Sequence, residues 1–361
     1  MTVRVSVDRM QGFAAALLAA AGVPGDAAVT CARVLVAADL DDNGSHGVLR
    51  LPTYLAAIAR EQIDPRARPE IVPTGPATAL VDGRQALGPV VALVAMEEAI
   101  RLACAAGAGV VAVRRSNHFG VAGYYAERAA AAGYVGVALT NTPPALAPPG
   151  GAAPYLGTNP MAFAFPTDDE PLVIDLSLSV VARGKILQAR QEGQAIPLGW
   201  ALDRTGQPTT DPAAALAGAL LPLGGPKGFA LALAVEVLTG VLAGAAWGPH
   251  VTQILDDTDA PADVGHLFIA IDPDRFGERG VFRRRLEVLL AELRDVPPAE
   301  GSAAIRLPGA RRAAARRRAL AEGITLPAAT VAALDTWAAR LGLADRLGAP
   351  SAPSSLEGHL G

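Results

Sequence analysis

The alternation of apolar and polar positions divides the chain into helical ends and a mixed middle. Apolar residues recur at helical spacing over residues 5–21 and 24–39 and, after the polar run DDNGSHG, over 48–63. Residues 64–76 are rich in proline and polar side chains, which favours a crossing into a new layer. The pattern therefore predicts a helical N-terminal segment, residues 1–76, that carries a Ser-His-Gly motif.

Further along, short apolar runs typical of strands alternate with longer helical patterns. The runs ATALVD, GVVAV and GVALTN are separated by helical patterns over 87–106 and 121–132, and MAFAF, PLVIDL and HLFIAID are further strand candidates. This alternation is typical of an α/β fold. We expect an α/β core over 77–308, C-terminal helices over 309–345 that pack on the N-terminal segment, and a flexible tail over 346–361.

A Pro- and Gly-rich loop over 142–160 interrupts this core, and a loop of that length is usually functional. Helical patterns follow over 180–192, 229–247 and 282–294. The pattern over 229–247 is long enough to cross a membrane, but a charge such as Glu236 near the centre of a span costs about 2.5–3.5 kcal/mol. We therefore expect a helix buried between protein layers and no membrane contact.

Composition excludes several classes of protein. The 361 residues are 51% hydrophobic and 18% charged, which supports a large folded core rather than disorder. The formal net charge is −4, and the body of the chain lacks the basic stripe that nucleic-acid binding requires. The arginine-rich stretch 306–318 has no interleaved aromatic residues and is predicted to be a solvated helical face. We expect no nucleic-acid partner.

The two cysteines, Cys31 and Cys104, both stand in alanine-rich apolar segments. We predict that both are buried, inert thiols, which fits a reducing cytosol. The N-terminal residues lack the continuous apolar core of a signal peptide. These features favour a cytoplasmic protein.

The run Gly107-Ala-Gly-Val-Val-Ala112 matches the loose dinucleotide pattern G-x-G-x-x-A. That pattern binds a pyrophosphate where the glycines follow a strand and open a helix. Here a helical pattern ends at the glycines and a strand pattern begins, so Gly107 and Gly109 are predicted to form a helix C-cap and turn. No Cys/His cluster has metal-ligand spacing, and we expect no metal.

Two of the five histidines stand in polar, glycine-flanked loops: His46 in GSHGVLR and His118 in RRSNHFG. Imidazole suits proton transfer near neutral pH because its ordinary pKa is about 6.5. A histidine in a loop is also commonly structural, so the neighbouring residues must decide. We expect the other three histidines, His250, His266 and His359, to lie at the surface.

The neighbours of His46 favour chemistry. Ser45 precedes it, and Arg50 lies four residues further on. A guanidinium there can hold a substrate carboxylate through two hydrogen bonds, with the imidazole beside it for a hydroxyl proton. Reduction of a 2-oxo acid needs this pair of groups. The alternative for Ser45 is that it caps a helix, and both interpretations can hold.

Asp175 ends the strand run LVID and is a candidate site carboxylate, either catalytic or cofactor-binding; the alternative is an N-cap for the helix that follows. Ser177 and Ser179 could bind a phosphate or a ribose. The Thr-Asn-Pro run at 158–160 supplies hydroxyl and amide donors. Lys227, in GGPKG at the start of an apolar helix, fits an anion site or an ordinary surface lysine.

With these residues assembled, the chain resembles the type-2 malate/L-lactate (L-sulfolactate) dehydrogenases, whose relatives include ureidoglycolate dehydrogenase, 2,3-diketogulonate reductase and Δ1-piperideine-2-carboxylate reductase. The matching runs include SHGVLRLPTYL, VAVRRSNHFGVAGYYA, LGTNPMAFAFP, VIDLSLSVVARGKI and LLPLGGPKGFALALAVEVLTGVLAGAAWG, in order over residues 10–345. The resemblance implies a mixed-sheet, non-Rossmann nicotinamide-binding core, flanked by N- and C-terminal helical segments and assembled as a homodimer.

The resemblance also implies roles for individual residues. His46 would be the proton donor and acceptor, with Ser45 and Asp175 as further catalytic residues. The substrate, a small carboxylate, would contact Arg50, Asn117, His118 and Thr158. The residues that would hold the NAD or NADP are Thr158, Asn159, Pro160, Asp175, Leu176, Ser177, Pro226, Lys227, Gly309, Ala310 and Arg311.

Three departures from the family pattern stand out. Asp41-Asp42-Asn43-Gly44 replaces a run that has Arg-Gly ahead of Ser-His-Gly and an acidic residue beside the serine, so a device for raising the His46 pKa is lost unless Asp41 or Asp42 replaces it. Pro226 stands in place of a histidine. Ala310 replaces a glutamate that could bind a ribose hydroxyl, which favours NADP over NAD or else weaker binding of the cofactor. Together they suggest a divergent specialist of secondary metabolism.

The leading hypothesis is an NAD(P)-dependent oxidoreductase that interconverts a 2-hydroxy, amino or cyclic imino carboxylate and its 2-oxo or 2-imino partner, a class that includes ketimine reductases. A second hypothesis is non-redox chemistry, elimination or condensation on a carboxylate, in the same fold. A third is a binding protein that has lost turnover. The joint presence of Ser45, His46, Arg50 and His118 argues against this last hypothesis.

Overall fold

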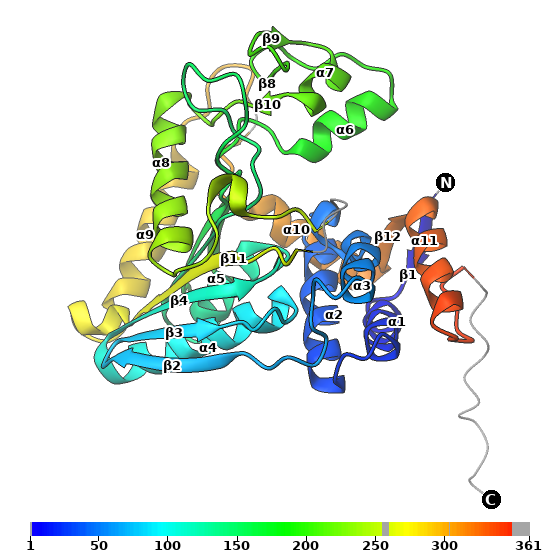
Figure 1. The fold of residues 1–361 in the computed structure, drawn as a ribbon. Coiled ribbons are helices and arrows are strands. Elements are labelled where there is room, and N and C mark those ends of the chain that lie inside the picture. Colours follow the sequence, from blue (N-terminus) through cyan, green and yellow to red (C-terminus); the bar gives the residue numbers. More distant parts are fainter. Residues whose placement is uncertain (1, 255–259, 303, 349–361) are drawn as a thin grey trace, which may run out of the picture.

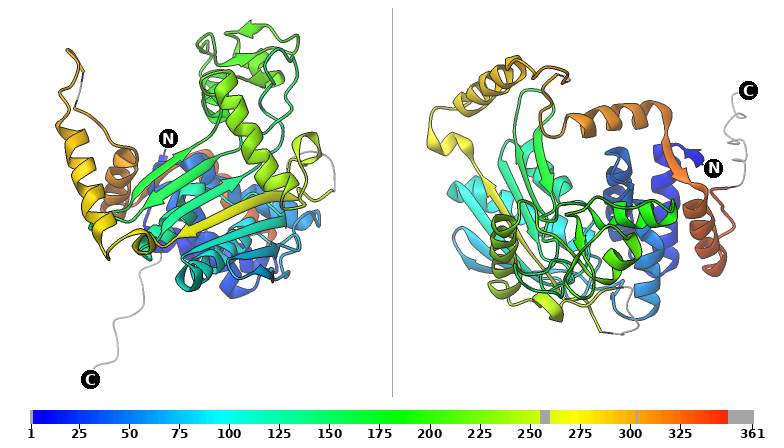
Figure 2. Two further views of the ribbon diagram at one scale, coloured as in Figure 1. Left: turned by 90° about the vertical axis from the view of Figure 1, so that its left-hand side faces the viewer. Right: turned by 90° about the horizontal axis from the view of Figure 1, so that it is seen from above.

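The computed structural model describes residues 2–254, 260–302 and 304–348. The two ends of the chain pack together beside a large sheet, and a smaller group of elements stands above it (Figures 1 and 2). The tail predicted over 346–361 lies, from residue 349 onward, outside the described residues.

The ends of the chain are joined by two strands that the helical patterns did not predict. The N-terminal elements are β1 (Thr2–Val5), α1 (Val7–Ala20), α2 (Gly25–Leu40), the 3₁₀ turns Gly44–His46 and Val48–Arg50, and α3 (Leu51–Ala59). The C-terminal ones are α10 (Ala310–Glu322), β12 (Ile324–Pro327) and α11 (Ala328–Arg340). β1 pairs antiparallel with β12 over their whole length. Each strand is four residues long, too short to show a period of two.

Buried apolar side chains from both ends form one core. Burying such a side chain contributes about 1.5–3 kcal/mol. The C-terminal helices thus pack on the N-terminal segment. The larger contributors are Met10, Phe13, Leu17, Leu35, Leu51, Leu55, Leu326, Val331 and Leu334.

The middle of the chain forms a mixed seven-stranded sheet in the order β2-β3-β4-β11-β5-β6-β7. β3 and β4 are parallel, and every other neighbouring pair in it is antiparallel. This confirms the predicted mixed α/β fold. The strands are β2 (Glu70–Gly75), β3 (Thr78–Asp82), β4 (Ala108–Ser116), β5 (Val135–Thr140), β6 (Met161–Phe165), β7 (Leu172–Leu176) and β11 (Val264–Ile271). β2 lies in the stretch predicted as a polar crossing, because it is an edge strand exposed on both faces.

Helices cover both faces of this sheet, as Figure 2 shows. α4 (Gly88–Ala106) and α5 (Ala122–Ala131) pack on one face, and α8 (Pro226–Glu236) with the π-helical turn Val237–Val241 packs on the other. The first face buries the larger core, which includes Val81, Met96, Val111, Tyr125 and Phe268.

Gly107 and Gly109 lie where a helix ends and a strand begins, as their sequence context predicts. Gly107 caps α4 in the left-handed region with φ of 88°, which favours glycine. A Cβ on Gly109 would lie 2.1 Å from the carbonyl oxygen of Ala99, so this glycine lets β4 approach α4 closely. Neither glycine opens a helix.

The helix predicted over 229–247 differs from expectation in length and in burial. α8 begins at Pro226, and the π turn ends at Val241. One side of it is buried, but Leu231, Val241 and Leu242 are about half exposed or more, at 49%, 56% and 63%. The prediction of a helix buried between layers is therefore wrong, because an apolar composition does not show that both sides are covered. No helix in the described part of the chain is long and apolar enough to span a bilayer.

The remaining elements are a small unit of two helices and a three-stranded sheet, one further helix and two 3₁₀ turns. Above the sheet in Figure 1 stand α6 (Arg183–Gln191), α7 (Pro212–Ala217) and a three-stranded sheet of β8 (Ala201–Leu202), β9 (Pro208–Thr209) and β10 (Ala219–Leu220). α9 (Val281–Asp295) follows the 3₁₀ turn Pro273–Phe276, and a further such turn spans Gly248–His250. The two-residue strands gave no pattern in the sequence.

The two cysteines differ in environment. Cys31 is fully buried, as predicted, and burial raises the pKa of its thiol. Cys104 is exposed, which corrects the prediction of two buried thiols. It lies on the outer side of α4, where an apolar neighbourhood in the sequence does not imply burial.

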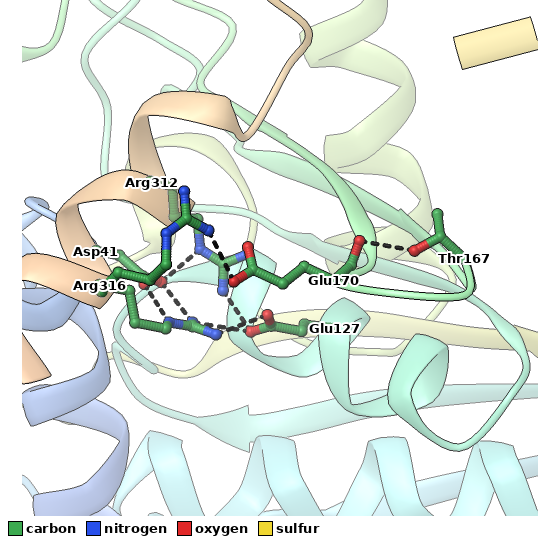
Figure 3. Close-up of polar contacts among 7 residues, drawn as sticks. Asp41, Glu127, Thr167, Glu170, Arg312 and Arg316 are labelled. Atoms are coloured by element: carbon green, nitrogen blue, oxygen red, sulfur yellow. Dashed lines mark hydrogen bonds and ion pairs between the residues drawn. The ribbon is translucent and has the colours of Figure 1, made fainter. Parts of the chain in front are cut away.

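An ion cluster joins α10 to α2 and α5 (Figure 3). Arg312 and Arg316 of α10 each bind both Asp41, at the end of α2, and Glu127 of α5; in the Arg316 pairs the closest contacts are 2.8 Å. The Asp41 side chain is 6% exposed and that of Arg316 is 29% exposed. The prediction of a solvated arginine face is therefore wrong for these two residues, whose partners are distant in the sequence.

The cluster depends on the negative charge of Glu127. The two guanidinium groups outweigh the effect of burial and lower the pKa of Glu127 below its ordinary 4.5. A carboxyl group with a lowered pKa contributes stability that is present above its ordinary pKa and lost as pH falls through the lowered value. The cluster should therefore weaken only in acid.

Two arginines on the same helix allow a matched stability test. Arg316→Met should lower the free energy of unfolding by about 3 kcal/mol, because it leaves two largely buried carboxylates with one cation. Arg317 pairs with Glu170 at 3.0 Å on the surface, with side chains 65% and 55% exposed. Arg317→Met should cost less than about 1 kcal/mol. Urea unfolding at neutral pH measures both, and equal losses would contradict a stabilising role for the cluster.

Candidate functional site

The segment from Gly44 to Arg50 folds as two successive 3₁₀ turns before α3 begins. The first turn is closed by the His46 N–H, which donates to the Asn43 carbonyl at 2.9 Å. The second is closed by the Arg50 N–H, which donates to the Gly47 carbonyl at 2.9 Å. This double turn places the side chains of residues 45, 46 and 50 close together.

The side chains of the double turn contact one another. Ser45 Oγ lies 2.9 Å from His46 Nδ1, and Arg50 Nε donates to the Ser45 carbonyl at 2.7 Å. Within the described residues Arg50 uses only Nε in a hydrogen bond, so its two terminal nitrogens can bind a carboxylate. The alternative role for Ser45, a helix cap, is not seen, because its hydroxyl faces the imidazole and Asn43.

His118 lies against His46. Their ring centroids are 5.6 Å apart and the rings are stacked at 25°. Tyr54 of α3 contacts His118 at two atoms. Its hydroxyl lies 2.7 Å from Nδ1 and donates to the His118 carbonyl oxygen at 3.0 Å. The Gly120 N–H donates to Nδ1 at 3.4 Å, which favours the tautomer with its proton on Nε2. Sequence analysis missed Tyr54, which has no motif signal of its own.

Both imidazoles are neutral at ordinary pH. Burial, with a further contribution from the Arg50 charge, lowers the pKa of His46 to about 4. Burial, reinforced by His46, Arg50 and His266, lowers the pKa of His118 well below 6.5. A neutral His46 can accept the proton of a substrate hydroxyl. A carboxylate bound at Arg50 would offset that cation and raise the His46 pKa, which favours proton donation in the reverse direction.

The acidic neighbours in the sequence do not contact His46. Asp41 is bound to Arg312 and Arg316, and Asp42 is exposed with φ of 59°. Neither residue therefore replaces the missing acidic neighbour of His46 through a direct contact.

Asn117 and His266 position the loop that carries His118. Asn117 is buried and its amide donates to the Ala86 carbonyl at 2.9 Å, so its side chain faces the loop interior rather than an open site. His266 is fully buried between Thr140 Oγ1 (2.7 Å) and Ser116 Oγ (2.8 Å), and burial lowers its pKa to about 3. The prediction of a surface role for His266 is wrong, because it lies in the central strand β11.

The other two histidines give no further candidate for this region. His250 is exposed, in a 3₁₀ turn. His359 lies outside the described residues.

The Thr-Asn-Pro run at 158–160 is fixed by a buried carboxylate. Asn159 is buried and donates to Glu236 Oε2 at 2.6 Å and to the Ala232 carbonyl at 2.9 Å. Glu236 accepts further hydrogen bonds from Asn141 and from the Gly248 N–H. The Asn159 amide therefore faces α8 and the protein interior, and the neighbouring Thr158 hydroxyl has no hydrogen bond within the described residues.

Asp175 and its neighbours lie at the end of β7. Asp175 Oδ2 accepts the Gly123 N–H at 2.8 Å, at the first turn of α5. The alternative that it caps the following helix is wrong, because α6 begins only at Arg183. Protein atoms around the Asp175 carboxyl remove it from water and so raise its pKa, and the Gly123 N–H and the Arg312 charge partly offset this effect. Asp175 makes no hydrogen bond to Ser45 or His46 in the described structure.

Ser177 and Ser179 form a chain of hydroxyls beyond Asp175. Their Oγ atoms are 3.1 Å apart, and Ser179 Oγ donates to the Val181 carbonyl at 2.8 Å. Leu176 pairs with Met161 of β6. Ser177 is half-buried, which leaves it available for a ligand hydroxyl or phosphate.

The other predicted cofactor residues come from two helix N-termini. Pro226 and Lys227 begin α8, and Lys227 is exposed. Gly309 precedes α10 with φ of 81°, and a Cβ there would lie 3.0 Å from the Val173 carbonyl oxygen. This close approach brings Ala310 and Arg311 beside β7.

These residues offer the donor types that a nicotinamide dinucleotide requires: two cations, Lys227 and Arg311, suited to phosphates, and serine and threonine hydroxyls suited to a ribose. No three His, Cys, Asp or Glu side chains within the described residues are grouped as a metal site requires.

The comparisons with known proteins agree with this geometry. The model of the malate/L-lactate dehydrogenase family matches residues 5–335. The (2R)-3-sulfolactate dehydrogenase (NADP(+)) of Chromohalobacter salexigens is 43% identical, over 94% of this chain and 99% of that protein. The ureidoglycolate dehydrogenase (NAD(+)) of Escherichia coli is 39% identical, over 86% of this chain and 88% of that protein.

The solved structure of the sulfolactate dehydrogenase from Methanocaldococcus jannaschii superposes with a TM-score of 0.89 and 40% identity, covering 94% of this chain and 98% of that one. The mixed α/β fold and these matches define an oxidoreductase of hydroxy acids. The chain belongs to the malate/L-lactate dehydrogenase family. The resemblance seen in its motifs is confirmed, and with it an NAD(P)-dependent dehydrogenase.

The neutral state of His46 can be measured directly. Its imidazole should titrate near pH 4 in the ligand-free protein. Arg50→Gln should raise this pKa, because removing a nearby cation makes protonation easier. Carbon-13 NMR of labelled histidine, assigned with a His46→Asn variant, measures both values. A His46 that titrates near 6.5 in the wild type would contradict the burial argument.

Proposed function

We propose that the chain transfers hydride between NAD(P)H and a small 2-oxo or 2-imino carboxylate, with His46 as the proton donor and acceptor. The observation that carries this proposal is the placement of His46, stacked on His118 and next to an arginine whose terminal nitrogens are open. Arg50 would bind the substrate carboxylate, and His46 would exchange the proton.

The residues divide the work as follows. Arg50 binds the carboxylate through two hydrogen bonds and sets the orientation of the substrate. His118 donates from Nε2 to a substrate oxygen, and Tyr54 holds the ring in place. Ser45 Oγ lies against His46 Nδ1, so Nε2 of His46 is the atom that exchanges the proton. The cofactor, when bound, supplies the hydride.

The proton step can be tested by substitution. Purified protein with NADPH or NADH and a panel of 2-oxo acids and cyclic imines should show loss of the reduced-nicotinamide absorbance. His46→Ala should lower kcat by about 10²–10⁴-fold. Full turnover by that variant would remove His46 from the mechanism.

We also propose that the cofactor is held along β7 and the starts of α8 and α10, with NADP preferred to NAD. Thr158, Asp175, Ser177, Lys227 and Arg311 would contact it. In place of a glutamate, Ala310 leaves no carboxylate to bind the ribose hydroxyls of NAD or to repel the extra phosphate of NADP. Known relatives include enzymes named for each cofactor.

The cofactor preference has its own test. Ala310→Glu should raise the KM for NADPH at least tenfold more than that for NADH, because a carboxylate beside a phosphate is repelled. Ala313→Glu, one turn further along α10, serves as a control for charge alone. Equal effects of the two variants on both cofactors would contradict the assignment.

The redox hypothesis is favoured over elimination or condensation, since the curated relatives described above are named as dehydrogenases. A thermal-shift screen separates the two, because a bound cofactor raises the melting temperature by mass action. Stabilisation by NAD(P) with turnover of a 2-oxo acid supports the redox reaction, and turnover that needs no nicotinamide supports the other. A specialised biosynthetic substrate remains part of the proposal.

We further propose a cytoplasmic homodimer with a nicotinamide site unlike the Rossmann crevice. The sheet has a single parallel pair, and its glycine pair ends a helix rather than opening one. The exposed apolar side of α8 and the π turn, with Leu231, Val241 and Leu242, suits an isologous interface. Free thiols suit the cytosol. Sedimentation velocity of the purified protein measures the assembly.

A further inference from the structure

A carboxylate that sequence analysis did not single out packs against the double turn. Asp39 stands in the last turn of α2, and its Oδ2 accepts the Val48 N–H at 2.8 Å. A Cβ built on Gly47 would lie 2.0 Å from Oδ1, 2.3 Å from Cγ and 2.4 Å from Oδ2. The carboxylate therefore fills the space that a side chain at position 47 would need.

The same carboxylate also approaches the first turn. A Cβ on Gly44 would lie 3.6 Å from Asp39 Oδ1. Gly47 has φ of −86° and ψ of −150°, so its φ lies outside the left-handed region. Contact with the carboxylate is by itself enough to exclude a larger residue at position 47.

An acidic residue at position 39 does not stabilise α2. A negative charge in the last turn of a helix opposes the helix dipole. Burial raises the pKa of Asp39 to about 7, offset only by the Val48 N–H, and no cationic side chain in the described structure pairs with it. The favourable effect of Asp39 must therefore be on the double turn, whose Val48 N–H it binds.

The double turn carries the groups assigned to the reaction. Gly47 accepts from the Arg50 N–H, and Ser45 accepts from Arg50 Nε at 2.7 Å. A shift of the turn relative to α2 would therefore move His46 and Arg50 together. Asp39 is the side chain that ties this turn to the rigid helix.

We propose that Asp39 is a positioning residue for the reaction, which fixes His46 and Arg50 by clamping the Val48 N–H and packing against the bare Cα of Gly47. This inference rests on the proposed function for its activity readout. Asp39 acts through the backbone, because burial and Arg50 account for the His46 pKa and no hydrogen bond joins Asp39 to the imidazole.

A double-mutant cycle tests the contact. Gly47→Ala should lower kcat by about 10²-fold, since an added methyl must push the turn away from the carboxylate and a 1 Å misplacement has that effect. In an Asp39→Ala background the methyl has room, so Gly47→Ala should cause almost no further loss. The KM for the cofactor and the melting temperature control for general damage. Equal losses in the two backgrounds would overturn the proposal.

The conservative variant separates the clamp from the charge. Asp39→Asn keeps an oxygen acceptor for the Val48 N–H and the shape of the group, so it should retain kcat within about tenfold, well above Asp39→Ala. Asp42→Asn removes a charge of the same kind on an exposed residue and should behave as wild type. Loss in Asp39→Asn as large as in Asp39→Ala would overturn the clamp.

A structural readout makes the inference independent of the reaction. A crystal structure of Gly47→Ala should show residues 44–50 displaced from α2, and the double variant should show them no further from α2 than they are in Asp39→Ala alone. An undisplaced turn in Gly47→Ala overturns the proposal even in an active enzyme. If the turn moves as expected but the wild type turns over no 2-oxo or 2-imino acid, the proposed function fails while the clamp stands.

Discussion

The site depends on one contact between two parts of the chain, the packing of the double turn and α3 against the loop that carries His118. The Tyr54 hydroxyl reaches His118 Nδ1 at 2.7 Å, and the two imidazoles stack at 5.6 Å. Neither part contains the complete set of groups: Arg50 and His46 come from the helical segment, and His118 follows a strand of the sheet. The geometry of the proposed site therefore depends on how the helical segment is held against the core.

The rest of the structure maintains that packing. The β1–β12 pair and the shared core hold the ends of the chain together, and the ion cluster at Arg312 and Arg316 ties α10 to both α2 and α5. α2 ends at the cluster and contains Asp39, so the same helix is fixed at its end and supports the double turn. On the core side, buried His266 and Asn117 brace the loop of His118.

Local patterns predicted the α/β core and the trio of Ser45, His46 and Arg50, because spacing in sequence sets their proximity. Contacts between distant residues carried no such signal. Arg312 lies 271 positions from Asp41 and was expected in solvent. Glu236 was visible only as a charge unsuited to a membrane, although it holds Asn159 from 77 positions away. The family resemblance supplied the cofactor residues, which alternating patterns do not indicate.

The most direct measurement of the central claim is a crystal structure of the ternary complex with oxidised cofactor and a 2-hydroxy acid. The substrate carboxylate should lie on the terminal nitrogens of Arg50, with its hydroxyl about 2.6–3.2 Å from His46 Nε2 and the nicotinamide ring facing the carbon between them. A carboxylate bound away from Arg50, or a hydroxyl that meets neither imidazole, would contradict the account.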